Sequence, residues 1–177
     1  MKIETASLAY LESFWKAVDS VARERKFLHF VKAPEIESTH TFLKEIQENE
    51  WTQVFAIEAG EVVGWCDIIP YPYEGSKHVA RMGMGVVANH RRKGIGEKLL
   101  SKAIADAQSK GIKRIEMEVF STNTPAIELY KKLGFQVEGR KLKARELDGI
   151  ECDFIIMALH SDQVEPADRE YGVLRRT

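Results

Sequence analysis

Apolar side chains recur every three or four positions in four segments of the chain, and this spacing predicts four amphipathic helices. The expected helices cover residues 7–24, about 40–49, 96–110 and 123–133. Gly111 and Gly134 follow the last two helices, and glycine is a common residue at the end of a helix because it readily adopts positive φ. The segment between the first two helices, 26–34, is apolar and ends at a proline, so we expect a loop there.

The remaining apolar runs are shorter, rich in β-branched residues and partly alternating, which predicts strands. They cover a short N-terminal segment and residues 54–58, 62–69, 79–87, 115–119, 136–143 and 150–159. The turn residues Ala59-Gly60-Glu61 and Asp148-Gly149 predict two antiparallel hairpins. Strand and helix alternate from residue 79 to 133, which implies right-handed crossovers and locally parallel strands. The expected fold is therefore α/β (α+β), with a single mixed and mostly antiparallel sheet flanked by helices.

The composition and charge narrow the class of protein. Hydrophobic residues make up 44% of the 177 residues, which suits one globular domain, expected at 1–160 and followed by a polar tail at 161–177. Lys and Arg number 26 against 27 Asp and Glu, so the chain lacks the broad positive surface that nucleic acid or an anionic membrane would require. With neither an apolar run of about eighteen residues nor a secretory leader, we expect a cytoplasmic protein.

The two cysteines, Cys66 and Cys152, have no metal-ligand spacing and lie in expected strands. We therefore expect both to be buried structural thiols that behave as small hydrophobes. No metal site is expected.

The most distinctive chemistry lies in the run Arg91-Arg92-Lys93-Gly94-Ile95-Gly96, between an expected strand and an expected helix. Such a turn directs several backbone N–H groups and a helix N-terminus to one point, which favours a phosphate group. The spelling matches neither the phosphate loop of the NTPases nor the three-glycine dinucleotide fingerprint.

This loop, as Arg91-x-x-Gly94-x-Gly96, resembles the acetyl-CoA pyrophosphate loop of the Gcn5-related N-acetyltransferase (GNAT) superfamily. A second run, Asn123-x-x-Ala126-x-x-Leu129-Tyr130-x-x-Leu133-Gly134-Phe135, resembles that superfamily's other cofactor-side motif. The resemblance is carried by motifs from about 83 to 139 and is looser up to residue 159. The ending of the chain is most similar to the branch that acetylates free amino acids or protein N-termini.

The resemblance implies a GNAT fold with a splayed central sheet and acetyl-CoA as cosubstrate. The pantetheine arm would pair with the strand that ends at 85–87, and a backbone N–H near Val86 would bind the thioester carbonyl. Asn123, a favoured N-cap, is also implied to contact the pantetheine arm, while Ala126 leaves it room. The expected cofactor-binding residues are Val86, Val87, Arg91, Arg92, Lys93, Gly94, Ile95, Gly96, Asn123, Ala126 and Tyr130.

Tyr130 is the expected catalytic acid. It lies two helical turns after Asn123 on the same face, where its phenol can protonate the departing CoA thiolate. The base is less determined: Glu118 is our first candidate, and Glu116, Asp67 or a water chain are alternatives. Arg81 occupies a strand on which some family members place an acid, so that version of the mechanism does not fit this chain.

The function expected from the resemblance is direct transfer of an acetyl group from acetyl-CoA to a primary amine, with no covalent enzyme intermediate. The acceptor would be an amino acid, a peptide N-terminus or another small amine, and acidic residues of 24–37 and 146–153 are either its contacts or a solvated surface. Two alternatives remain, a noncatalytic CoA-binding regulatory module and an acyltransferase for another acyl-CoA. A homodimer is possible for this family.

Overall fold

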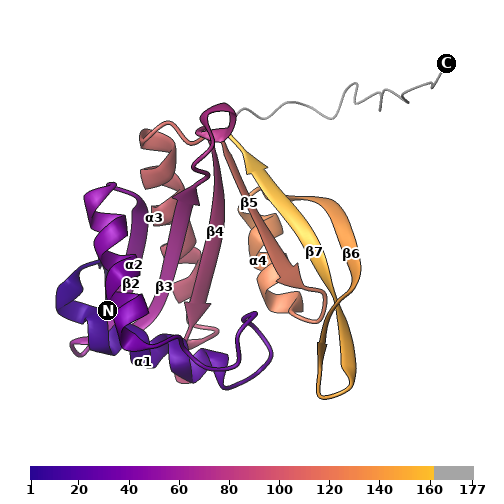
Figure 1. The fold of residues 1–177 in the computed structure, drawn as a ribbon, viewed down its shortest axis with the longest axis horizontal. Coiled ribbons are helices and arrows are strands. Elements are labelled where there is room, and N and C mark those ends of the chain that lie inside the picture. The colour runs from indigo at the N-terminus through magenta and orange to yellow at the C-terminus, as the bar shows by residue number, and fades with distance from the viewer. Residues whose placement is uncertain (162–177) are drawn as a thin grey trace.

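A computed structural model of the chain describes residues 1–161 and shows one twisted sheet with helices on both faces (Figure 1). Seven strands lie in the order β1-β2-β3-β4-β5-β7-β6. Their bounds are β1 Lys2–Thr5, β2 Thr52–Glu58, β3 Glu61–Pro70, β4 Val79–Val86, β5 Arg114–Phe120, β6 Gln136–Leu147 and β7 Ile150–His160. The α-helices are α1 Leu11–Ala22, α2 Ile36–Glu48, α3 Ile95–Ser109 and α4 Thr124–Lys132, with 3-10 turns at Leu8–Tyr10, Glu74–Ser76 and Ala88–His90.

All neighbouring strands are antiparallel except β4 and β5, which are parallel. This confirms the expected mixed, mostly antiparallel sheet. The two hairpins turn at Ala59-Gly60 and Asp148-Gly149, and all four residues have positive φ. Two successive residues of positive φ match the right-handed twist of the flanking strands, which explains why these dipeptides close the hairpins.

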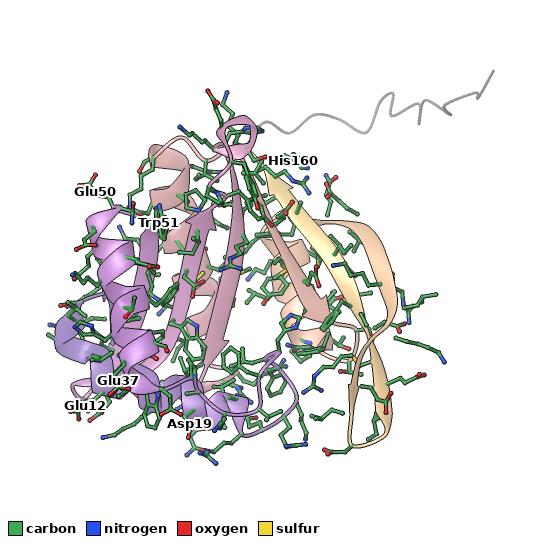
Figure 2. All side chains as sticks on the ribbon, in the orientation of Figure 1. Glu12, Asp19, Glu37, Glu50, Trp51 and His160 are labelled. Carbon is green, nitrogen blue, oxygen red and sulfur yellow. The ribbon has the colours of Figure 1, made fainter. Side chains whose placement is uncertain are left out.

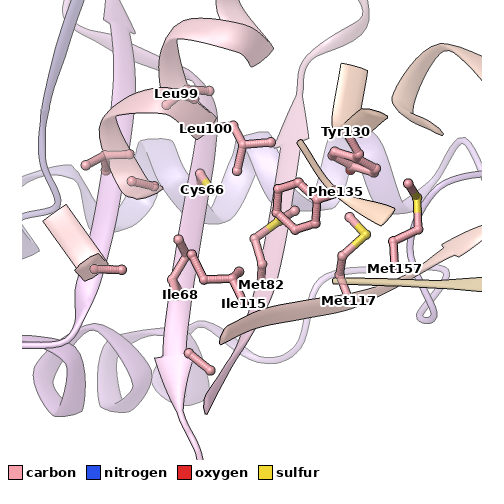
Figure 3. Close-up of a cluster of buried hydrophobic side chains, with 14 of the residues drawn as sticks. Cys66, Ile68, Met82, Leu99, Leu100, Ile115, Met117, Tyr130, Phe135 and Met157 are labelled. Atoms are coloured by element: carbon pink, nitrogen blue, oxygen red, sulfur yellow. The ribbon is translucent and has the colours of Figure 1, made fainter. Parts of the chain in front are cut away.

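Two hydrophobic clusters cover the two faces of the sheet. One joins the sheet to α3 and α4 and contains Met82, Leu99, Met117, Tyr130 and Phe135 (Figure 3). The other joins β2 and β3 to α1 and α2 on the opposite face, where Phe14 packs against Phe55 and Trp65. Successive residues of one strand therefore pack into different clusters, because side chains along a strand point alternately to the two faces of the sheet.

Several local expectations need correction. The first helix begins at Leu11 rather than residue 7, because a 3-10 turn capped by the Ser7 side chain comes before it. The first hairpin turn has two residues rather than three, since Glu61 already pairs with Glu58. Cys66 is buried as expected, but Cys152 is only partly buried, near the hydroxyls of Ser121 and Thr122.

The single-domain boundary at 160 stays a prediction, and the expected tail at 161–177 lies outside the described residues except for Ser161. Within the part of the chain that the structure describes, no helix has both the length and the apolar character needed to cross a bilayer.

We predict that Gly85→Ala destabilises the fold. A Cβ at this position would come within 2.3 Å of the Trp65 ring, so the indole must move from its place against Phe14. Overpacking of this kind costs about 1–3 kcal/mol, measured as a lower midpoint of urea unfolding. The matched control is Gly75→Ala, where an added Cβ has no neighbour within 4 Å, and its stability should stay within about 0.5 kcal/mol of the parent.

Candidate active site

The sheet opens between β4 and β5. These strands share only three register pairs, from Val79–Arg114 to Arg81–Glu116, and then diverge toward their C-terminal ends (Figure 1). On its other side β4 stays paired with β3, and the Val87 N–H still donates to the Val63 carbonyl at 2.9 Å. Because backbone groups alternate along a strand, the N–H of Val86 points to the open edge. The splay expected from the resemblance is therefore present, and the N–H of the expected residue, Val86, has no backbone partner within residues 1–161.

A cleft of about 1390 Å³ occupies this opening and reaches both faces of the sheet. On the α3–α4 face it is lined by the basic loop and by residues of α4. On the α1–α2 face it is lined by apolar side chains of both helices and of the segment between them, and by polar side chains of β3, β4 and β5. The polar residues on that face are Asp67, Tyr71, Arg81, Glu116 and Glu118.

The loop that leads into α3 has the geometry of an anion site. Arg92 and Gly94 have φ of 62° and 75°, and such alternation of backbone conformation makes successive N–H groups converge. The backbone N–H groups of Arg92, Lys93 and Gly94 donate to no other group in residues 1–161. The N-terminus of α3 begins at Ile95 and adds its own unpaired N–H groups and positive dipole end. These residues fit a pyrophosphate.

The side chain of Arg91, expected among the cofactor-binding residues, is engaged by other groups of the protein. Its guanidinium forms a paired contact with the Glu24 carboxylate, its Nε donates to the Val86 carbonyl at 2.7 Å, and it lies 4.6 Å from the centroid of the Phe27 ring. These contacts do not favour an additional contact from the Arg91 side chain to a phosphate of the cofactor. Arg91 instead ties the segment after α1 to the edge of β4, and leaves the local positive charge to Arg92 and Lys93.

Asn123 and Ala126 line the cleft at the start of α4, as expected. The Asn123 backbone carbonyl accepts from the N–H groups of Ala126 and Ile127, both at 3.1 Å, but its side chain makes no capping hydrogen bond. Asn123 is therefore the N-cap residue of α4, as expected, but its side chain does not make the capping hydrogen bond. The amide faces a cleft instead of closing a helix end.

Tyr130 lies in the core of the α3–α4 face, 6% exposed, with its ring centroid 5.9 Å from that of Phe135 (Figure 3). Its hydroxyl reaches the cleft and has no hydrogen-bond partner among the described residues. Burial, with a smaller contribution from nearby Cys66, raises the pKa of the phenol. Tyr130 therefore stays protonated at neutral pH and can act as a proton donor.

The three carboxylates considered as bases have different surroundings. Glu118 is paired with Lys141 of β6, and Glu116 accepts from the Tyr71 hydroxyl at 2.8 Å and from Arg114 at 2.9 Å. Asp67 has no hydrogen bond or ion pair within residues 1–161. Removal from water raises the pKa of its carboxyl to about 7, with nearby Arg81 acting in the opposite direction.

On the α1–α2 face of the cleft, called here the acceptor side, three contacts were not anticipated from the sequence. Trp65 lies over Gly85, and the Asp67 carboxylate lies over Gly83, where an added Cβ would be 2.9 Å from Oδ2. Two glycines at alternate positions of one strand were the available signal, since they leave room for large side chains on the neighbouring strand. His29, between α1 and α2, packs on Phe120 and Phe154 across the gap.

The acidic residues expected near the acceptor are mostly a solvated surface. Glu37 is exposed near the start of α2 (Figure 2) and does not line the cleft. Asp148 pairs with Arg25, and Asp153 binds Arg140. Glu24 is bound by Arg91, which lines the cleft.

The model of the acetyltransferase (GNAT) family matches residues 15–135, more than half of the chain. The chain belongs to the GNAT family. The family assignment made from the two motifs is thereby confirmed. The match includes both motifs, the splayed strands and Tyr130.

Two curated relatives are similar to part of the chain. The L-amino acid N-acetyltransferase AaaT of Escherichia coli is 34% identical over 107 residues, covering 60% of this chain and 66% of that protein. The L-methionine sulfoximine/L-methionine sulfone acetyltransferase of Pseudomonas aeruginosa is 29% identical over 110 residues, covering 62% and 64%. The chain thus spans slightly less than two thirds of the length of these relatives.

Solved structures support the fold. Salmonella typhimurium YncA, in a structure that contains acetyl-CoA, matches with a TM-score of 0.85 at 21% identity over 95% of this chain and 98% of that one. At this identity the likeness shows the GNAT fold alone.

We predict that Glu24→Gln destabilises the protein through Arg91. The pair is largely sheltered from water, and its loss leaves the guanidinium partly buried without its counter-charge. The expected cost is about 1–3 kcal/mol, measured by urea unfolding. Glu12→Gln, on the exposed side of α1, is the matched control and should change stability by less than about 0.5 kcal/mol (Figure 2). Equal midpoints for the parent and Glu24→Gln would contradict this role for Arg91.

Proposed function

We propose that this protein is an acetyl-CoA-dependent N-acetyltransferase that acetylates the α-amine of free amino acids. The observation that carries the proposal is the single cleft through the splay of β4 and β5. It joins an anion-binding loop and a buried phenol on one face of the sheet to a polar pocket on the other. The curated relatives that act on amino acids support the choice of acceptor.

The residues that would hold acetyl-CoA follow from the geometry of the loop and the strand edge. Backbone N–H groups of 92–96 suit the pyrophosphate, and the open edge of β4 suits the amide groups of the pantetheine arm. The Val86 N–H is directed at the gap, where it can stabilise negative charge that develops on the acetyl oxygen. Asn123 and Ala126 border the same path. Acetyl-CoA supplies the activated acetyl group.

Tyr130 is the proposed proton donor. The acceptor nitrogen must attack as a neutral amine, and the departing sulfur must gain a proton. The phenol donates that proton, and it is restored by the proton that the acylated nitrogen gives up. Burial keeps Tyr130 protonated, and the same removal from water makes a thiolate that forms beside it more basic, so the phenol can still protonate the sulfur.

Arg81 supports a free amino acid over an amine without a carboxylate. It lies on β4 at the last register pair before the splay, it is exposed to the cleft, and it forms no ion pair or hydrogen bond in the described part of the chain. A guanidinium binds carboxylates in bidentate fashion. We therefore assign Arg81 to the α-carboxylate of the acceptor.

A cytoplasmic location, a homodimer and the single-domain boundary stay predictions. The proposal also includes the cofactor-binding residues expected from the sequence, apart from the changed role of the Arg91 side chain.

We predict that Tyr130→Phe lowers kcat by about 10²–10⁴-fold, the usual range for loss of a proton-transfer group. Phenylalanine still fills the core beside Phe135, so folding and acetyl-CoA affinity should be unchanged. CoA release, followed with a thiol-reactive dye, measures turnover, and calorimetric titration measures acetyl-CoA binding. Unchanged turnover in the variant would remove Tyr130 from the mechanism. Acetyl-CoA binding by a parent that transfers no acetyl group would instead indicate a noncatalytic module.

A second prediction concerns the acceptor. Arg81→Gln should raise KM for an L-amino acid by about 10–100-fold, because a charge-assisted contact to its carboxylate is lost. KM for the corresponding amino acid amide, which carries no carboxylate, should hardly change. Lys16→Gln, an exposed cation on α1, is the charge-matched control. Equal effects of Arg81→Gln on the acid and on the amide would exclude a carboxylate contact.

A further inference from the structure

We propose that Asp67, rather than Glu118, is the base that takes the proton from the acceptor's amine. This assignment rests on the proposed N-acetyltransferase function and names a residue of the same site.

Asp67 is directed at the place where the amine must lie. It lies opposite Gly83 in the β3–β4 ladder, and its carboxylate leans over that glycine toward the opening between β4 and β5. Any side chain at residue 83 would meet Oδ2, so the missing Cβ is what allows this orientation. Asp67 therefore faces the cleft from the α1–α2 face of the sheet. Its register partner on β4, Gly83, lies three residues before Val86, whose N–H points into the gap.

The competing carboxylates are already neutralised or bonded. Glu118 forms an ion pair with Lys141, and Glu116 is held by Arg114 and by the Tyr71 hydroxyl. The oxygens of these two carboxylates are therefore occupied by other groups of the protein rather than open to an incoming ammonium. Asp67 has no hydrogen bond or ion pair in residues 1–161. Removal from water raises the pKa of its carboxyl to about 7 although nearby Arg81 acts in the opposite direction, so this carboxylate is suited to accept a proton.

A second unpartnered group lies beside Asp67. Gln53 of β2 is its register partner, is 1% exposed, and neither of its side-chain polar atoms has a hydrogen-bond partner in the described residues. The backbone carbonyl of Gln53 accepts from the backbone N–H of Ala6, in the segment after β1, and therefore points away from β3. Gln53 and Asp67 thus form a non-hydrogen-bonded pair of the β2–β3 ladder, the kind of pair in which side chains are closest. An amide can donate to a carboxylate and accept from a carboxylic acid, so Gln53 is suited to both protonation states of Asp67.

Other titratable groups share the α1–α2 face of the cleft or lie next to Asp67. They are Arg81 on β4, Glu116 and Glu118 on β5, Tyr71 and the buried Cys66 on β3, and His29 between α1 and α2. The helices α1 and α2 contribute mainly apolar side chains to this part of the cleft, which keeps water from Asp67.

The proton balance of the step is simple. The acceptor ammonium gives one proton to the Asp67 carboxylate, and its nitrogen forms a bond to the acetyl carbon while the carbon–sulfur bond breaks. The thiolate gains a proton from Tyr130, which recovers one from the acylated nitrogen. Asp67 then releases its proton to solvent, so that one proton is produced for each acetyl group transferred.

The test compares the parent, Asp67→Asn, Asp67→Ser and Glu118→Gln, with a panel of free L-amino acids and L-methionine sulfone as acceptors. CoA release is measured from pH 5.5 to 9.5. In the parent, kcat/KM should rise through about pH 7 as Asp67 ionises. In both Asp67 variants this rise of kcat/KM near pH 7, the acidic limb of the pH profile, should be absent, and kcat/KM at pH 7.5 should be lower by about 10²-fold or more. Activity should partly recover at high pH, where the acceptor amine loses its proton to solvent without a base on the protein.

Thermal unfolding gives a readout that does not depend on activity. The carboxyl pKa of Asp67 is about 7 in the folded protein and near 3.8 when unfolded, so the folded state binds more protons between these values. Stability should therefore fall as pH rises from about 4 to about 7, and this fall should be smaller in Asp67→Asn. Unchanged acetyl-CoA binding by calorimetry shows that the variants are folded.

Each outcome decides the proposal. If both Asp67 variants keep the rates and the acidic limb of the parent, the proposal is overturned and the proposed function is left intact. The same conclusion follows if the limb is lost in Glu118→Gln alone. No transfer by the parent to any acceptor would overturn the proposal together with the proposed function. Loss of the limb only in the two Asp67 variants, with acetyl-CoA binding retained, is the expected result.

Discussion

The site depends on the separation of β4 from β5 after three register pairs. A strand that loses its neighbour exposes N–H and C=O groups that must be bonded or solvated. Here those groups border a cleft through the sheet, so the unpaired edge of β4 is available to an extended ligand without disturbing the β3–β4 ladder. The same separation lets side chains from opposite faces of the sheet line one cleft.

The two faces supply different chemistry because each strand alternates its side chains. On one face lie the basic loop that leads into α3, with its unpaired N–H groups, and the Tyr130 phenol of α4, which is set in a largely apolar layer. On the other, the carboxylate of Asp67 and the guanidinium of Arg81 lie under the apolar wall of α1 and α2. Gly83 and Gly85 make this second face possible, because their missing side chains are replaced by Asp67 and Trp65 from β3.

Arg91 links these layers. It binds the Val86 carbonyl at the edge of β4, Glu24 after α1 and the ring of Phe27 in the same segment. The shape of the acceptor side is therefore coupled to the strand edge that would receive the pantetheine arm. A residue of the most recognisable motif thus has a structural role, while Arg92 and Lys93 carry the local charge of the loop.

The sequence by itself determined the order of the elements, the mixed sheet and the family, because hydrophobic periodicity, turn residues and two glycine-containing motifs are local signals. It also indicated Tyr130, which follows Asn123 at helical spacing. It did not determine which of Asp67, Glu116 and Glu118 is left unpaired, or that Arg91 binds Glu24 some sixty-seven residues away. Those outcomes depend on strand register and on contacts between distant segments, which only the tertiary structure decides, because burial and pairing with a counter-charge are properties of the packed chain and not of the residue type.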